Sequence, residues 1–262
     1  MNTKTEPDSR TVLQVNEATL DFGGLRALSR VNMTINPGLI TSVIGPNGAG
    51  KTSLLNSISG FYHLTRGDIY YGERRLTQAS PHQVSNLGIA RAFQNIELFS
   101  GMTVLDNLLL ARHQNLKYNF LQALIYYGRT SRLEAENRAY VEDVIDFMEL
   151  EPYRKRTVGS LSYGVQKRVE VARALTLGPD LLLLDEPMAG MNIEEKEDMV
   201  RFILDIQTER EITVVLVEHD LGVVMDISDQ IYVLDFGQLI GEGQPDEVAA
   251  NPKVIEAYIG ED

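Results

Sequence analysis

The 262-residue chain contains no cysteine. This absence excludes disulfide bonds, thiolate zinc sites and cysteine nucleophiles. Histidine is also scarce: the four present, His63, His82, His113 and His219, are scattered rather than grouped at metal-ligand spacing. A metal centre built from cysteine or histidine is therefore not expected.

Long apolar runs are missing as well. The longest stretches, residues 181–184 and 213–217, have the length of buried strands, whereas a membrane-spanning helix needs roughly 20 residues. The first ten residues, MNTKTEPDSR, contain no apolar core and do not resemble a signal peptide. We therefore expect a cytosolic protein, or one that is peripheral to a membrane.

Positive charge is in short supply. The chain carries 24 Lys and Arg against 37 Asp and Glu, a net charge of −13. Residues 1–130 sum to +4 and residues 131–262 to −17. Because so acidic a chain binds nucleic acid and anionic lipid poorly, we expect no nucleic-acid partner, and docking on a protein rather than on lipid at any membrane. The mildly basic first half can still hold one compact polyanion.

The order of the predicted elements indicates an α/β protein. Apolar residues Val31, Met33 and Ile35 alternate with polar ones, as in a half-buried strand. Later strands and helices alternate, which predicts a parallel sheet. Predicted strands are residues 31–35, 40–44, 68–71, 181–184, 213–217 and a hairpin of 230–234 with 238–241; predicted helices are 51–59, 163–177 and 194–210, with a helical stretch at about 104–150.

A glycine-rich segment between the strand at 40–44 and the helix at 51–59 matches the phosphate-binding pattern G-x-x-x-x-G-K-[ST]. Its residues are Gly45, Pro46, Asn47, Gly48, Ala49, Gly50, Lys51 and Thr52, followed by Ser53. The glycines let successive N–H groups point at one phosphate, and the following helix adds its positive end. Lys51 suits the β- and γ-phosphates, and the Thr52 hydroxyl suits Mg²⁺. The segment predicts a nucleoside triphosphate site; the alternative is a flexible turn.

Two carboxylates follow the aliphatic strand at 181–184. Asp185 and Glu186 come at its C-terminal end, where open α/β sheets bind ligands. Asp185 suits the shell of a Mg²⁺ ion, and Glu186 suits the orientation and deprotonation of an attacking water. Alone, this segment is equally typical of an acidic turn after a core strand; the glycine-rich loop favours the catalytic interpretation.

Further motifs resemble those of ABC-transporter ATPases. The segment LSYGV (residues 161–165), followed by QKRVEVARAL, resembles their signature loop and helix. Phe93-Gln94-Asn95 resembles the Q-loop, and residues 217–220 (VEHD) resemble the histidine switch. Other segments resemble the ATP-binding subunits of importers for branched-chain and other hydrophobic amino acids. They are FGGLRAL, ARAFQNIELF, TVLDNLLLARH, AGMN and the ending EGQPDEVAANPKVIEAYIGED. The resemblance covers about residues 11–260.

The resemblance implies roles within one subunit. Phe22 would stack on adenine, for which an aromatic face needs no specific hydrogen bond; the alternative is a core aromatic at a strand end. Gln94 would complete the Mg²⁺ shell and sense the membrane partner. His219 would contact the γ-phosphate and the water held by Glu186. Outside their motifs, a lone glutamine or histidine is an ordinary surface or structural residue.

The resemblance also implies a head-to-tail dimer with two ATP molecules at its interface. Ser162 and Gly164 would press on the γ-phosphate held by the second copy; the alternative is a simple helix cap. The signature departs from the usual LSGGQ at two positions, its third and fifth, where this chain has Tyr163 and Val165. The loop after residue 186 ends in Asn192 instead of the usual Asp, which keeps hydrogen bonding and loses a charge.

The implied fold is α/β, a P-loop NTPase (RecA-like) core with an antiparallel β subdomain and a helical subdomain, of the ABC ATPase type. Residues 1–262 would form one ABC ATP-binding domain, with the core at about 11–94 and 178–262 and the helical subdomain at about 95–177. The implied activity is ATP hydrolysis with Mg²⁺, energising uptake of branched-chain or other hydrophobic amino acids through a separate membrane permease.

The implied partners are the transmembrane permease subunits, a second ATP-binding subunit, identical or paralogous, and indirectly an extracytoplasmic solute-binding protein. The expected location is the cytoplasmic face of the inner membrane. A groove between Gln94 and the helical insert, with Phe99 and residues 104–127, is the expected docking surface. Alternatives are an exporter ATPase, a non-transport ABC ATPase and a P-loop kinase. Non-transport ABC ATPases usually have tandem cassettes or a long coiled coil, and this chain has neither. A P-loop kinase would need an acceptor site, and none is evident.

Overall fold

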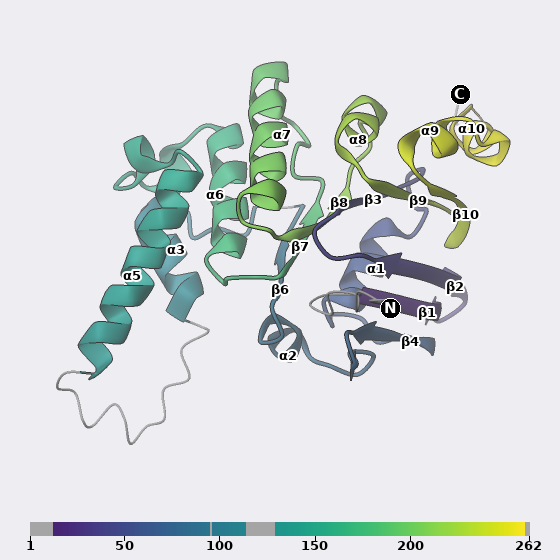
Figure 1. Cartoon of the computed structure of the whole chain (residues 1–262), viewed down its shortest axis with the longest axis horizontal. Coiled ribbons are helices and arrows are strands. Elements are labelled where there is room, and N and C mark those ends of the chain that lie inside the picture. The colour runs from purple at the N-terminus through teal and green to yellow at the C-terminus, as the bar shows by residue number, and fades with distance from the viewer. Residues whose placement is uncertain (1–12, 95, 114–128, 260–262) are drawn as a thin grey trace, which may run out of the picture.

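The computed structural model describes residues 13–94, 96–113 and 129–259. Two sheets organise this part of the chain (Figure 1). The smaller is antiparallel, in the order β2-β1-β4-β5, and the larger has the order β10-β9-β3-β8-β7-β6. The strands are β1 (Leu13–Phe22), β2 (Leu25–Ile35), β3 (Ile40–Ile44), β4 (Arg66–Tyr71), β5 (Arg74–Arg75), β6 (Ile89–Ala92), β7 (Leu181–Asp185), β8 (Thr213–Val217), β9 (Gln230–Asp235) and β10 (Gln238–Gly243).

Helices cover the larger sheet. They are α1 (Lys51–Ile58), α2 (Pro81–Ser85), α3 (Val104–His113), α5 (Arg129–Phe147), α6 (Tyr163–Leu175), α7 (Ile193–Thr208), α8 (Leu221–Ile227), α9 (Pro245–Ala249) and α10 (Pro252–Ile259). Short 3-10 turns occur at Glu151–Tyr153 and Val158–Ser160. None of the helices within the described ranges is both long and apolar enough to cross a membrane.

The core has two sides because successive side chains of each buried strand point to opposite faces of the sheet. Leu182 and Leu184 of β7 face a cluster built with α3, α5, α6 and α7, whereas Leu181 and Leu183 face α1 and the antiparallel sheet. Successive side chains of a strand point to opposite faces, so a strand made only of leucine needs cover on both sides. A third cluster packs α8, α9 and α10 on β3 and β9. Figure 1 shows α7 and α8 above the larger sheet and α1 below it.

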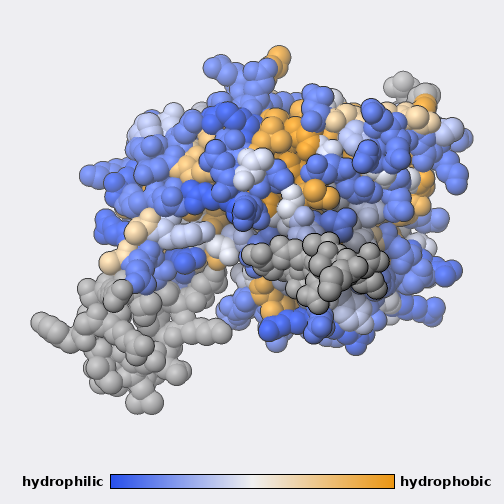
Figure 2. All heavy atoms as spheres, in the orientation of Figure 1, coloured by the Kyte–Doolittle hydropathy of each residue, from blue (hydrophilic) through white to orange (hydrophobic). Residues whose placement is uncertain are grey.

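Figure 2 shows how hydrophilic and apolar residues are distributed over one face of the molecule. The face shown is largely hydrophilic, with an apolar area between α7 and α8. Several basic side chains form ion pairs, for instance Arg201 with Glu149 at 3.0 Å and Lys196 with Asp220 at 2.8 Å.

Most predicted elements are present. The mixed α/β architecture, the strands at 31–35, 40–44, 68–71, 181–184 and 213–217 and the hairpin near 235 are confirmed. Short elements escaped the sequence analysis: β6 has four residues and α8 seven, too few to show a period. Helices α3, α5 and α6 lie in the range predicted for the helical subdomain; the boundaries at 95–177 stay a prediction. Asn95 and residues 114–127 lie outside the described residues.

The parallel register brings the predicted motifs to one edge. Val43 of β3 and Asp185 of β7 both pair with Val217 of β8, so the three strands end at the same level. The glycine-rich loop, the carboxylates after β7 and the histidine after β8 therefore leave the sheet together. This is the carboxyl edge at which open α/β sheets bind ligands.

The glycine-rich loop is held between backbone segments. The Gly237 N–H donates to the Ala49 carbonyl at 2.9 Å, and the Ser29 N–H donates to the Gly237 carbonyl at 2.8 Å. Gly45 has φ +146°, and a Cβ there would lie 2.0 Å from the Leu234 carbonyl oxygen. Glycine is thus required at 45 both by conformation and by space.

Substitution at Gly45 is expected to damage the fold more than substitution at Gly48. Gly48 also has a positive φ, +79°, but nothing lies within 4 Å of a Cβ there. Gly48→Ala should lower the free energy of unfolding by about 1–2 kcal/mol, the cost of left-handed backbone. Gly45→Ala should cost about 3 kcal/mol or more, because β9 must also move. Denaturant unfolding without nucleotide measures both; equal losses would contradict the close approach.

Candidate functional site

The glycine-rich loop connects β3 to α1 and places its lysine inside the loop. Lys51 is 6% exposed. Its ammonium donates to the carbonyl oxygens of Gly45 at 2.6 Å and Pro46 at 2.9 Å. Thr52 is exposed and Ser53 half-buried in the first turn of α1, whose N-cap is Gly50. A buried cation beside a helix N-terminus is a binding site for a polyanion.

Glu186 is the centre of a second cluster. Its Oε2 accepts a hydrogen bond from Gln94 Nε2 at 2.5 Å, and His219 Nε2 lies 3.0 Å from the same oxygen. Glu186 is 7% exposed, whereas the His219 side chain is 48% exposed. The structure thus brings together three of the predicted residues from three separate loops. Both contacts fall on one oxygen, so Oε1 of the carboxylate lies outside them.

The backbone at Glu186 is strained to aim this carboxylate. Glu186 has φ +51°, a left-handed conformation that side-chain-bearing residues seldom adopt. Its N–H donates to the Val217 carbonyl at 2.9 Å, which extends the β7–β8 pairing by one residue. Strain of this kind persists only where the surroundings over-determine it. Here the Gln94 and His219 contacts do so.

Asp185 lies in a buried ion pair that sequence reasoning missed. Arg91 of β6 donates through Nη2 to Asp185 Oδ2 at 2.6 Å, and the two side chains are 5% and 1% exposed. Arg91 Nη1 also donates to Asn56 Oδ1 and Ser59 Oγ of the α1 segment, at 2.6 and 3.1 Å. The register Ala92↔Leu184 places β6 beside β7 and makes this pair possible.

The residues predicted to bind Mg²⁺ have the chemistry for it. Asp185 Oδ1 is buried and has no hydrogen-bond partner among the described residues. Mg²⁺ binds oxygen ligands and usually keeps several waters. Thr52, Asp185 and Gln94 offer hydroxyl, carboxylate and amide oxygens of this kind. Within the described ranges, no group of three His, Asp or Glu is placed to hold a metal. The donor set fits an ion held jointly by protein, phosphate and water.

Glu218 is a second buried acid that the motif search left without a role. Its Oε1 accepts from the Met188 N–H at 2.9 Å and its Oε2 from the His219 N–H at 3.2 Å. Burial raises the pKa of this carboxyl, and the two N–H donors oppose that shift. Glu218 therefore ties the loop after Glu186 to the backbone of His219. The sequence signal that could have indicated a role for Glu218 was its position in the VEHD motif.

The aromatic residue assigned to adenine lies at the end of β1. The ring of Phe22 packs edge-on against Tyr62, with centroids 5.0 Å apart and planes at 78°. The two residues remain 44% and 36% exposed. Phe22 is therefore not a core aromatic, and Tyr62 is an additional surface aromatic that no motif indicated.

Ser162 and Gly164 begin α6, apart from the cluster around Glu186. Ser162 is the N-cap residue with extended backbone, is exposed, and makes no side-chain capping bond. No hydrogen bond within the described residues links it to the glycine-rich loop. Gly164 is buried, and a Cβ there would lie 2.3 Å from the carboxylate of Glu195. The hydroxyl of Ser162 is thus available for another molecule.

The departures from the usual motifs have structural counterparts. The ring of Tyr163 covers Gly190, where an added Cβ would lie 3.1 Å from it. Asn192 caps α7: its Oδ1 accepts from the Glu195 N–H at 2.9 Å, and Glu195 Oε2 accepts from the Asn192 N–H at 3.2 Å. Asn serves as an N-cap as well as Asp does. The substitution therefore preserves the start of α7.

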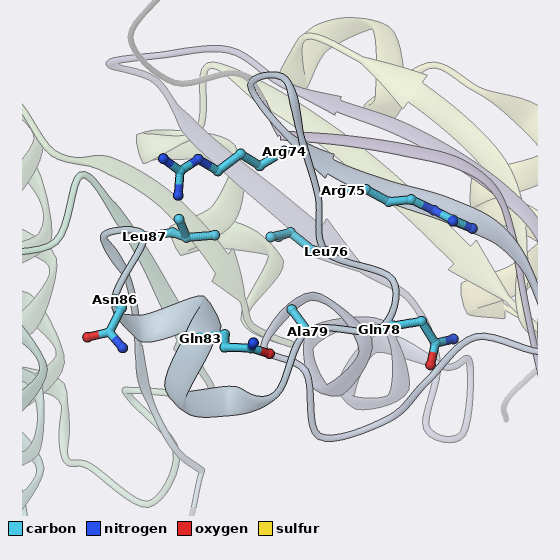
Figure 3. A pocket seen from close by; sticks show the side chains of 8 residues that line it. All are labelled: Arg74, Arg75, Leu76, Gln78, Ala79, Gln83, Asn86 and Leu87. Carbon is cyan, nitrogen blue, oxygen red and sulfur yellow. The ribbon is translucent and has the colours of Figure 1, made fainter.

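Another cavity lies apart from the predicted nucleotide residues. It has a volume of about 690 Å³ between β5 and α2, and Figure 3 shows Arg74, Leu76, Gln83 and Asn86 around it. None of the predicted nucleotide residues lines it. A cavity of about 440 Å³ borders the glycine-rich loop and is lined by Pro46, Asn47, Gly48, Ala49, Asp235, Phe236, Ile240, Lys253, Glu256 and Ala257.

Comparison with known proteins agrees with this geometry. A family model described as "ABC transporter" matches residues 28–189, more than half of the chain. The chain belongs to the ABC transporter family. A second model, "Branched-chain amino acid ATP-binding cassette transporter", matches residues 238–262 of this ABC ATPase. The high-affinity branched-chain amino acid transport ATP-binding protein BraF of Pseudomonas aeruginosa is 40% identical over 253 residues, 97% of this chain and 99% of that protein.

Solved structures of ABC cassettes share the fold. A nucleotide-free ATP-binding cassette from an ABC transporter is 33% identical, with a TM-score of 0.82 over 95% of this chain and 99% of that one. The dimeric post-hydrolysis state of another cassette, bound to ADP and Pi, is 25% identical, with a TM-score of 0.75 over 89% and 98%. The predicted fold class and ATPase activity are confirmed, and the P-loop kinase alternative was wrong.

The buried pair of Arg91 and Asp185 should dominate the stability of this edge in the ABC ATPase. Arg91→Met leaves a buried carboxylate unpaired and should lower the free energy of unfolding by about 3–5 kcal/mol. Arg26→Met, which removes the exposed pair with Asp21, should leave the free energy of unfolding nearly unchanged, because solvent screens an exposed pair. Denaturant unfolding with Asp185→Asn and the double variant completes the cycle. Additive single losses at 91 and 185 would contradict direct coupling.

Proposed function

We propose that this ABC ATPase energises uptake of branched-chain or other hydrophobic amino acids through a separate membrane permease. The observation that carries the proposal is the extent of the match. The similarity to BraF spans 97% of the chain, and a branched-chain-specific model covers residues 238–262, beyond the "ABC transporter" match at 28–189. A general ATPase core explains the match at 28–189 and leaves the branched-chain-specific match at 238–262 unexplained. Import, rather than export or a non-transport role, is the function these relatives support.

ATP is bound by the loop from Gly45 to Thr52, with Ser53 in the first turn of α1. On binding, the Lys51 ammonium exchanges the carbonyls of Gly45 and Pro46 for phosphate oxygens. Because the ammonium is already buried beside the loop, little reorganisation is needed. Phe22, supported edge-on by Tyr62, offers its face to adenine.

Hydrolysis is assigned to Glu186 as the base that deprotonates the attacking water. Gln94 and His219 hold Oε2, which orients the carboxylate and leaves Oε1 for the water. His219, half exposed at the mouth of this cluster, is placed to contact the γ-phosphate. Mg²⁺, when bound, neutralises charge on the phosphates. Thr52, Asp185 and Gln94 would hold it, with Arg91 keeping Asp185 oriented.

A second ATP-binding subunit, identical or paralogous, completes each site in a head-to-tail dimer. The dimeric cassette structure supports assembly of this kind. Within this chain the support is Ser162, whose exposed hydroxyl makes no capping bond at the start of α6. That hydroxyl, with the buried Gly164 and the helix end, suits the γ-phosphate of the partner's ATP.

The permease subunits are expected to dock beside Gln94. Phe99 is 55% exposed close to α3, where its N–H donates to Asn107 Oδ1 at 2.9 Å. An exposed aromatic on a fixed backbone suits a protein partner. Docking there makes the ATPase peripheral at the cytoplasmic face of the inner membrane. The extracytoplasmic solute-binding protein then acts only indirectly, and nucleic acid has no role.

Glu186→Gln should separate binding from turnover. The amide keeps shape and hydrogen bonding but cannot take a proton, so ATP turnover should fall about a hundredfold or more while ATP affinity stays within a few-fold. Size-exclusion chromatography with Mg-ATP should show a trapped dimer, and leucine uptake by reconstituted vesicles should stop. Glu197→Gln, at an exposed position of α7, is the matched control. Normal hydrolysis by Glu186→Gln would refute the assignment of the base.

Ser162→Arg should block the dimer and spare the monomer. The side chain would fill the γ-phosphate position across the interface, whereas the subunit's own loop from 45 to 52 is untouched. ATP binding at low protein concentration should therefore stay near wild type, and the dimer trapped by Glu186→Gln should be lost. Ser162→Ala should weaken the trapped dimer without abolishing it. Loss of monomer binding would mean that Ser162 serves its own subunit.

A further inference from the structure

Helix α6 carries a buried lysine and a buried glutamate that the proposed chemistry does not use. Lys167 and Glu170 are each 1% exposed and lie one turn apart beneath the Q-loop segment at 93–99. Lys167 is among the largest fully buried side chains that the structure describes. Its ammonium binds the main-chain carbonyl of Gln94, a residue 73 positions away in the sequence.

The pair and a neighbouring arginine hold the Q-loop segment by its backbone. Lys167 Nζ donates to the Gln94 carbonyl. The Glu97 N–H donates to Glu170 Oε1 at 3.4 Å, and Arg173 Nη1 donates to the Glu97 carbonyl at 2.8 Å. These contacts fix the backbone at Gln94 and at Glu97. A fixed backbone at Gln94 limits where its own side chain can point.

Stability alone does not explain this arrangement. Burial lowers the pKa of Lys167 and raises the pKa of Glu170 to about 7, so both groups are held away from the solvent that favours their charges. Apolar side chains of similar volume, in place of buried charged groups, are often neutral or stabilising. Lys167 instead supplies what an apolar residue cannot, a donor directed at one carbonyl.

The next contact leads to the catalytic cluster. The side chain of Gln94, whose carbonyl Lys167 binds, donates to Glu186 Oε2 at 2.5 Å. One continuous set of contacts therefore runs from α6 through Gln94 to Glu186. Ser162, the N-cap of helix α6, lies five residues before Lys167.

We propose that Lys167 is a positioning residue for ATP hydrolysis: by fixing the Gln94 backbone, it sets the Gln94–Glu186 contact and links the base to helix α6. The proposal rests on the assignment of Glu186 as base. Lys167 touches neither nucleotide nor water in this scheme and acts through Gln94 alone. It should therefore affect the chemical step, because the loop that binds the phosphates begins elsewhere, at Gly45.

Lys167→Met removes the donor and keeps much of the buried volume. We expect kcat for ATP hydrolysis by the full chain to fall about 10- to 100-fold, as for a misplaced catalytic group, with KM for ATP changed less than about threefold. Lys167→Arg keeps a donor and should restore kcat to within about fivefold of wild type. Lys155→Met, which removes an exposed lysine, should leave both constants unchanged.

Thermal unfolding of each variant separates positioning from misfolding. If Lys167→Met does not fold, Lys167→Gln, which stays polar but is too short to reach the carbonyl, replaces it with the same expectation. A wild-type kcat, a rise in KM with kcat unchanged, or failure of the arginine variant to recover kcat would each overturn the proposal. Glu186→Gln run in parallel keeps the two assignments distinct. Full turnover in that variant removes the base assignment itself, whereas an inactive Glu186→Gln with a wild-type Lys167→Met overturns only the role of Lys167.

Discussion

The level at which β3, β7 and β8 end is the constraint on which the site depends. Val217 pairs with both Val43 and Asp185, so three loops leave the sheet side by side. A shift of any one strand by one residue would move each of its side chains to the opposite face of the sheet. Because each of these strands is buried on both faces, the register is held by two packed layers. The catalytic geometry is thus a consequence of core packing.

Buried charge is confined to this edge and to the segment beneath the Q-loop. Within the described ranges, the buried charged residues are Lys51, Lys167, Glu170, Asp185, Glu186 and Glu218, together with the side chain of Arg91. Each is bonded to backbone or to an opposite charge, except Glu186, which is bonded to the side chains of Gln94 and His219. Removing these groups from water is costly, and each of them either belongs to the candidate site or holds the backbone beside it.

The sequence predicted the residues of the candidate site better than the residues that hold them in place. The glycine pattern identified Lys51, the aliphatic strand identified Asp185 and Glu186, and the resemblance to ABC-transporter ATPases identified Gln94 and His219. Arg91, Lys167 and Glu218 could not be found in this way, since their partners lie 94, 73 and 30 residues distant. Contacts of that kind depend on strand order and helix placement, which a local pattern does not contain. Asn192 looked like a weakened interface residue, and its neighbours show it to be a helix cap.

Helix α6 connects the two ends of the proposed mechanism within one subunit. At its start, Gly164 lies against Glu195 and Tyr163 covers Gly190, so the signature loop packs directly on the segment that follows Glu186. One turn later, Lys167 holds the Gln94 backbone, and Gln94 holds Glu186. The signature loop is thus tied to the base from both sides, through α7 and through the Q-loop. A nucleotide that moves Ser162 must displace these contacts together, because close-packed elements shift as units rather than deform. In the proposed mechanism, closure of a dimer and alignment of the base would therefore be parts of one motion.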